Sequence, residues 1–209
     1  MTDSELFLNT LKAKFPEARC ELNYNSVFQL VICVILSAQC TDKRVNIVTK
    51  ELFKCYPTAE KLANADISDV ENIIKPCGMY RQKAKNIIAC SQKIINNFGG
   101  EIPKTIEELT TLDGVGRKTA SVVLVEGYKI PAMPVDTHIF RVSRRLGLSE
   151  ANDVLGVEKD LRSLYPESEW VALHFRIVLF GRYYCKAVKP ECENCEFRAT
   201  CKYLKEKNK

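Results

Sequence analysis

The chain has 209 residues, of which 46% are apolar and 27% charged, with ten cysteines and a formal charge of +5. These proportions exclude a disordered, collagen-like or fibrous chain, and the length suits one large domain or two small ones. The longest apolar run, 30–36, has seven residues, whereas a membrane helix needs about 20, so we expect no membrane association. The acidic start, MTDSELF, does not resemble a targeting leader, and we expect a cytoplasmic protein.

Apolar residues recur with the period of an α-helix along nearly the whole chain, which predicts an all-α fold. The run at 30–36 indicates a buried helix. A longer stripe covers 87–98 and ends at Gly99-Gly100, where glycine is typical just beyond a helix. A last helical pattern runs from about 170 to 184.

Helix starts are marked by side chains that can cap the first turn. The spacing of a capping box occurs twice, and a third start follows two prolines. The three predicted starts are Ser68 with Glu71, Thr105 with Glu108, and the segment 135–137, whose helix we expect to stop at Gly147.

Ten cysteines in a cytoplasmic protein do not indicate a disulfide scaffold, so metal binding is the better interpretation. Six are scattered, and we expect them to be small buried side chains: Cys20, Cys33, Cys40, Cys55, Cys77 and Cys90. The other four have the spacing C-x6-C-x2-C-x5-C: Cys185, Cys192, Cys195 and Cys201. Four thiolates so close in sequence repel one another unless a metal neutralises them. Their spacing alone leaves both zinc and an iron–sulfur cluster open.

A Gly-x-Gly turn lies between two helical patterns at 112–120. Gly114, Val115 and Gly116 permit a sharp turn whose backbone N–H groups face outward, where the next helix begins with Arg117. Such a turn can hold a phosphate oxygen of a nucleic acid without reading its sequence.

The segment 112–120 resembles the helix-hairpin-helix of DNA glycosylases, and 135–141 resembles the loop and aspartate that follow it in these enzymes. The string LSAQCTD at 36–42 is similar to a third segment of the family, which lies near DNA. Together with the cysteine tail, these motifs most closely resemble the endonuclease III family, bifunctional glycosylases of base-excision repair. The resemblance implies a partner, double-stranded DNA that contains oxidised pyrimidines or abasic sites.

The resemblance also implies a two-domain fold. A six-helix domain would cover 21–131 and contain the helix-hairpin-helix at about 105–125. Residues 1–20 would join 132–209 in an iron–sulfur cluster domain, with a [4Fe–4S] cluster on the four cysteines of 185–201. We expect a monomer of bacterial or archaeal origin that binds DNA between the two domains and acts at the nucleoid.

Two residues match the chemistry that the family performs. Breaking an N-glycosidic bond develops positive charge on the sugar, which a carboxylate such as Asp136 can stabilise. The amine of Lys118 can attack the sugar and form a Schiff base, after which β-elimination cleaves the strand on the 3′ side. Taken alone, Lys118 is better interpreted as a phosphate contact or a solvated surface lysine, and Asp136 as a helix N-cap; both motifs together favour the catalytic roles. Capping and catalysis are compatible, because a cap orients the carboxylate.

An enzyme that acts on a paired nucleotide must extrude it, and the space left behind must be filled. The resemblance assigns this role to Gln39 and, in a second loop, to Met79. The alternatives are a solvated glutamine and a core methionine. Lys186 and Lys189 lie between the first two clustered cysteines, where the resemblance implies a phosphate contact.

Lys118 also separates branches of the family. The adenine glycosylases usually carry Ser at this position and the thymine-mismatch glycosylases Tyr, so neither has the amine that strand cleavage needs. A monofunctional adenine or mismatch glycosylase stays an alternative, as does a non-catalytic helix-hairpin-helix module with a redox cluster. We expect structural roles for the two histidines, His138 and His174.

Overall fold

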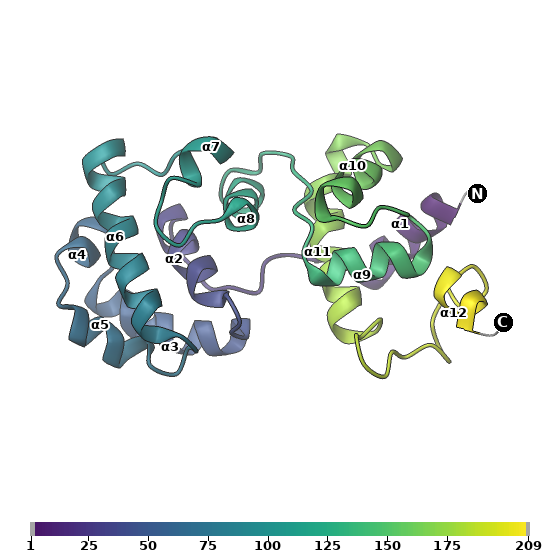
Figure 1. Ribbon diagram of the computed structural model, residues 1–209, viewed down its shortest axis with the longest axis horizontal. Helices are drawn as coiled ribbons and strands as arrows, with labels where there is room; N and C mark the ends of the chain where they lie inside the picture. The colour runs from purple at the N-terminus through teal and green to yellow at the C-terminus, as the bar shows by residue number, and fades with distance from the viewer. Residues whose placement is uncertain (1–2, 208–209) are drawn as a thin grey trace. The chain divides into compact units, whose positions relative to one another are not determined.

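The computed structural model describes residues 3–207, and within that range it contains twelve α-helices and no strand, which confirms the all-α prediction. The chain forms two compact units, one over 21–130 and one that combines the residues up to 20 with those from 131 onward. The helices of each unit can be followed by label and colour in Figure 1. None of the helices formed by the described residues has the length and apolarity needed to cross a bilayer.

The unit over 21–130 is built around one helix that is apolar on every side. This helix, α2, contacts α3, α6 and α8, and all its residues from Phe28 to Leu36 are buried. A helix without a polar face must be surrounded by others, which explains its central place. The unit has seven helices, where the resemblance implies six, and two of the seven are short, with five residues in α4 and four in α7. The helices are α2 (Val27–Ser37), α3 (Asp42–Cys55), α4 (Ala59–Ala63), α5 (Ile67–Ile74), α6 (Tyr80–Phe98), α7 (Ile106–Leu109) and α8 (Arg117–Tyr128).

The second unit has its own core around α11, which contacts α1 and α9. Phe197, from the cysteine tail, packs against Phe7 of α1 and Phe180 of α11, with ring centroids 5.1 and 5.4 Å apart. The first helix and the tail therefore share one core despite their distance in sequence. The helices are α1 (Asp3–Lys14), α9 (Thr137–Leu146), α10 (Val154–Leu164), α11 (Glu167–Tyr183) and α12 (Lys202–Lys207).

Most predicted helix ends are confirmed. Thr105 caps α7, and Gly99 and Gly147 follow α6 and α9 with φ values of 61° and 76°. The prediction that Ser68 starts a helix is wrong, because Asp66 is the cap of α5 and accepts hydrogen bonds from the amides of the second and third residues after it. Aspartate is as good an N-cap as serine, and here it comes first along the chain.

The burial predicted for the six scattered cysteines is only half correct. Cys33, Cys77 and Cys90 are buried, as predicted. The prediction is wrong for Cys55, which ends α3 on its exposed side, and Cys20 and Cys40 are only half-buried.

Candidate functional site

The Gly-x-Gly turn between α7 and α8 is pinned to the core of its unit. The amide of Val115 donates to the carbonyl of Leu112 at 3.1 Å, and the Val115 side chain is buried. Gly114 has a φ of +78°, and a Cβ placed on it would lie 3.0 Å from the Cβ of Asn86 and 3.2 Å from Ile35. Glycine is therefore required at 114 for its backbone conformation and for the close approach of α6 and α2.

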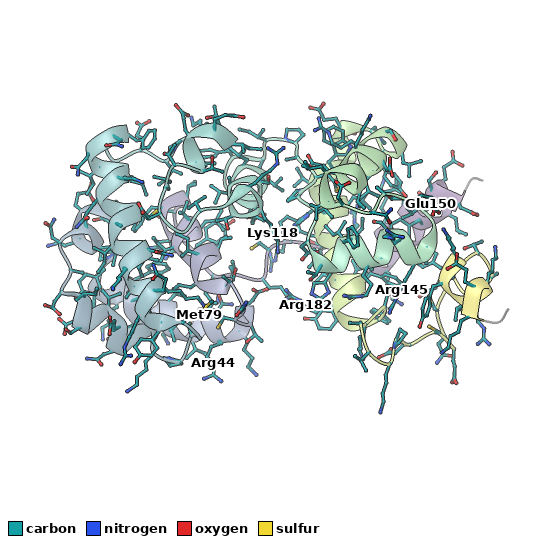
Figure 2. All side chains as sticks on the ribbon, in the orientation of Figure 1. Arg44, Met79, Lys118, Arg145, Glu150 and Arg182 are labelled. Atoms are coloured by element: carbon teal, nitrogen blue, oxygen red, sulfur yellow. The ribbon has the colours of Figure 1, made fainter. Side chains whose placement is uncertain are left out.

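The residues after this turn form an open, electropositive helix start. Gly116 is the N-cap of α8 and carries no side-chain cap, and a Cβ placed there would meet nothing within 4 Å. Arg117 and Lys118 follow it, and both are exposed; Figure 2 labels Lys118 at the start of α8. The first amides of a helix have no acceptor within it, and the dipole makes this end positive. The arrangement can bind a phosphate and present an amine beside it.

Asp136, which belongs to the other unit, caps α9. Its carboxylate accepts a hydrogen bond from the amide of Ile139 at 2.8 Å, and the residue is half-buried. The cap holds the carboxylate in one orientation, as the sequence predicts for this position.

Both histidines have structural hydrogen bonds, as predicted. Nδ1 of His138 lies 3.1 Å from a guanidinium nitrogen of Arg141, which can only donate. Burial lowers the pKa of His138 below its usual value, which favours the neutral ring. His174 is buried in α11, and its Nδ1 lies 2.9 Å from the carbonyl of Pro134.

Two arginines of α9 that the sequence analysis missed hold the start of the cysteine tail. Arg141 donates to the carbonyls of Cys185 and Gly181 at 3.0 and 2.8 Å. Arg145, labelled in Figure 2, donates to the carbonyl of Lys186 at 2.7 Å and lies 3.6 Å from Sγ of Cys185. Their spacing of four residues, which places them on one helix face, is the only signal in the sequence. The helix that begins at Asp136 therefore also fixes the cysteine tail.

The four clustered cysteines line one pocket. Phe180 and Leu146 form apolar parts of its wall, beside Arg145. Burial raises the pKa of Cys195 and of Cys201, and the charge of the other clustered thiols raises it further. Within residues 3–207 no three His, Cys, Asp or Glu side chains are gathered closely enough to hold a single metal ion. The pocket nevertheless offers four soft sulfur ligands, the donor set that suits an iron–sulfur cluster.

Gln39 and Met79 are exposed residues with unusual backbone conformations. Their φ values are 53° and 55°, in the left-handed region that side chains other than glycine rarely adopt. Met79 is 55% exposed, so it is not a core methionine. Gln39 follows the end of α2 and Met79 directly precedes α6, and both helices belong to the unit over 21–130.

The two lysines of the tail differ in their surroundings. Lys189 is exposed and has a φ of 51°. Lys186 forms an ion pair with Glu191 at 2.6 Å. A phosphate would therefore have to compete with Glu191 for Lys186, whereas no ion pair is described for Lys189.

Comparison with known proteins shows similarity over the whole chain. The family model of HhH-GPD superfamily base excision DNA repair proteins matches residues 32–167. Endonuclease III of Bacillus subtilis is 45% identical over 206 residues, which cover 98% of this chain and 94% of the relative. Endonuclease III of Synechocystis sp. is 46% identical over 192 residues, covering 91% and 88%. A solved structure of a trapped endonuclease III–DNA covalent intermediate, an estranged-adenine complex, matches with a TM-score of 0.93 and 42% identity, covering 100% of both chains.

Proposed function

The chain belongs to the HhH-GPD superfamily of base excision DNA repair proteins and, within it, to the endonuclease III family, and from this premise we propose which of its residues perform the reaction. The protein is a base-excision-repair DNA glycosylase, with DNA as its partner. We infer that it removes oxidised pyrimidines from duplex DNA and then cleaves the strand at the abasic site. The observation that carries the second activity is the exposed lysine at 118, at a helix start open to phosphate.

Lys118 is the nucleophile in this proposal. The amides at the start of α8 bind a phosphate near the lesion, and the Lys118 amine attacks C1′ as the bond to the damaged base breaks. The sugar ring of this adduct then opens at the C1′–O4′ bond, O4′ takes up a proton that the amine gives up, and the resulting Schiff base makes the C2′ proton acidic. Removal of that proton expels the 3′ phosphate by β-elimination. The trapped covalent intermediate of the related enzyme with DNA supports a covalent route of this kind.

Asp136 stabilises the positive charge that the sugar develops. Its orientation by the Ile139 amide supports this role, because a carboxylate already held in place loses little entropy when it acts. Gln39 and Met79 enter the space that the extruded nucleotide leaves, a role that their exposure and left-handed backbones support. Arg117, Lys189 and Lys186 contact the DNA backbone.

We further propose that the four cysteines that line one pocket hold a [4Fe–4S] cluster. When bound, the cluster cross-links the tail and so orders the loop that carries Lys186 and Lys189. Glycosidic cleavage and β-elimination transfer no electrons, so the residues of the chain complete both steps without it. We place this activity in the cytoplasm, at the nucleoid.

Borohydride trapping tests the role of Lys118. Borohydride reduces a Schiff base to a stable amine, so the wild-type protein should become covalently attached to DNA that contains one thymine glycol. Lys118→Ala should lower the trapped yield by about 100-fold or more, because no other group is expected to replace the amine. Lys159→Ala, which removes an exposed lysine of α10, is the matched control and should trap normally. Trapping that is undiminished in Lys118→Ala would contradict the proposal.

Asp136→Asn separates capping from catalysis in the same assay. Asparagine caps a helix nearly as well as aspartate, so α9 should persist while the charge is lost. Excision of thymine glycol should fall by about 100-fold, and trapping on a preformed abasic site should fall much less.

The wild-type protein itself distinguishes the alternative functions. Excision of the base without cleavage of the strand would indicate a monofunctional glycosylase, and DNA binding without either reaction would indicate a non-catalytic module.

A further inference from the structure

Lys83 is a buried lysine that bonds to the end of α2. Its side chain is almost wholly enclosed, with 4% of the residue exposed. Its Nζ donates to the carbonyls of Leu36 and Ala38 at 2.9 and 2.8 Å. These carbonyls lie at the C-terminal end of the helix, where a lysine donor is favourable, and Gln39 is the next residue.

The same lysine belongs to the first turn of α6, which begins after Met79. The amide of Lys83 donates to the carbonyl of Met79 at 3.0 Å. Met79 is the N-cap of this helix, and no side-chain hydrogen bond caps it. A single residue therefore bonds to the segment of Gln39 through its side chain and to the segment of Met79 through its backbone.

A second contact joins the two segments at the same place. Cys40 follows Gln39, and Cys77 lies two residues before Met79. The pKa of the Cys77 thiol is raised to about 12; burial is the largest cause, and a hydrogen bond with Cys40 is the second. The charge of Lys83 acts on the same thiol in the opposite direction and lowers its pKa, so the side chains of Lys83, Cys40 and Cys77 lie close together.

We propose that Lys83 is a positioning residue, which fixes Gln39 and Met79 relative to each other so that together they can replace an extruded nucleotide. The inference rests on the proposed function of those two residues. Left-handed backbones at non-glycine residues are strained and persist only where the surroundings impose them. Lys83 supplies that constraint, and without its amine the Leu36 carbonyl would lose its buried partner.

The test compares two reactions of the full chain, because they depend differently on base extrusion. Excision of thymine glycol from a duplex requires extrusion of a paired base, whereas β-elimination at a preformed abasic site has no base to extrude. Lys83→Met should lower kcat/KM for excision by about tenfold and leave β-elimination within about twofold of wild type. A 2-aminopurine placed opposite the lesion should also show a smaller fluorescence change on binding, since insertion beside the orphaned base is impaired.

One control variant and two other substitutions of Lys83 complete the test. Lys85→Met removes an exposed lysine two residues along the same helix and should leave the ratio of the two reactions unchanged. Lys83→Arg retains a donor and should restore the ratio; if Lys83→Met does not fold, Lys83→Gln takes its place in both assays. The proposal is overturned if Lys83→Met slows both reactions equally or slows neither. Failure of the proposed function is distinct, because the wild-type protein would then not cleave abasic sites.

Discussion

Four non-glycine residues of the described chain have positive φ values, and three of them are among the DNA contacts of the proposed mechanism: Gln39, Met79 and Lys189. The fourth, Lys129, ends α8. A residue type does not reveal such strain, because neither glutamine, methionine nor lysine favours the left-handed region. At Gln39 and Met79 the strain coincides with exposure and with the bonds of Lys83, which is the pattern of a side chain held ready for a ligand.

Burial at the residue scale also predicts how the cysteines react. In the native protein at pH 8, iodoacetamide should modify Cys55 first, because it is exposed. Cys77 and Cys90 should react more than about 100-fold more slowly, since burial raises the pKa of each thiol to about 12 and the thiolate is the nucleophile. Peptide mass spectrometry over time measures the rates, and in urea the three should become similar. Equal modification rates of Cys55 and Cys90 in the native protein would contradict the buried position of Cys90.

At the scale of elements, the two glycines of the hairpin between α7 and α8 have different roles. Gly114 is enclosed by α6 and α2 and has a left-handed backbone, whereas Gly116 faces open space at the helix start. The first glycine is needed for folding, and the second keeps the approach to the amides clear. The Gly-x-Gly string does not distinguish them, because the difference lies in what packs against each.

Substitution should separate these two roles. Gly114→Ala should lower the free energy of unfolding by about 1–3 kcal/mol, from the left-handed backbone and the 3.0 Å approach of Asn86. Gly116→Asp should leave stability unchanged or raise it, because aspartate is a good N-cap. It should nevertheless weaken DNA binding by about tenfold or more, since its charge lies where a phosphate would bind. Denaturant unfolding and fluorescence anisotropy measure the two effects, and equal losses of stability would refute the assignment.

At the scale of the whole molecule, the chain builds two cores, and the cysteine tail belongs to one of them. Phe197 of the tail packs on Phe7 and Phe180, and Cys185 and Cys195 lie against the same core. Arg141 and Arg145 tie the start of the tail to α9. Loss of a cluster should therefore loosen this unit, while the unit over 21–130 keeps its own core around α2.

Cluster removal tests this division. The purified protein should be brown, with a broad visible absorption band, and should lose the band when an oxidant and a chelator remove the iron. Amide hydrogen exchange should then accelerate by about tenfold or more in 181–201, while amides of α6 stay within about twofold. A colourless protein that contains zinc would refute the cluster, and equal acceleration in both units would refute the separate cores.

Prediction from the sequence succeeded where the signal is local. Thr105 and Asp136 cap helices because a short side chain with an oxygen, placed just before a helical pattern, can accept a hydrogen bond from an amide of the first turn. The helix ends at Gly99 and Gly147 follow from the freedom of glycine in the same way. The prediction for Ser68 was wrong because Asp66, an equally good cap, lies two residues before it and starts the helix.

The sequence by itself determined the all-α fold, the hairpin with its lysine, the capping aspartate and the set of four cysteines, because periodicity, caps and spacing are short-range properties of the chain. Only the tertiary structure decided that Cys55 is exposed, that Met79 lies outside the core and that the four cysteines line one pocket. Only the tertiary structure, too, brought Lys83 to the carbonyls of Leu36 and Ala38. Such contacts join residues more than 40 positions apart, and they follow from which helices pack together rather than from any local pattern.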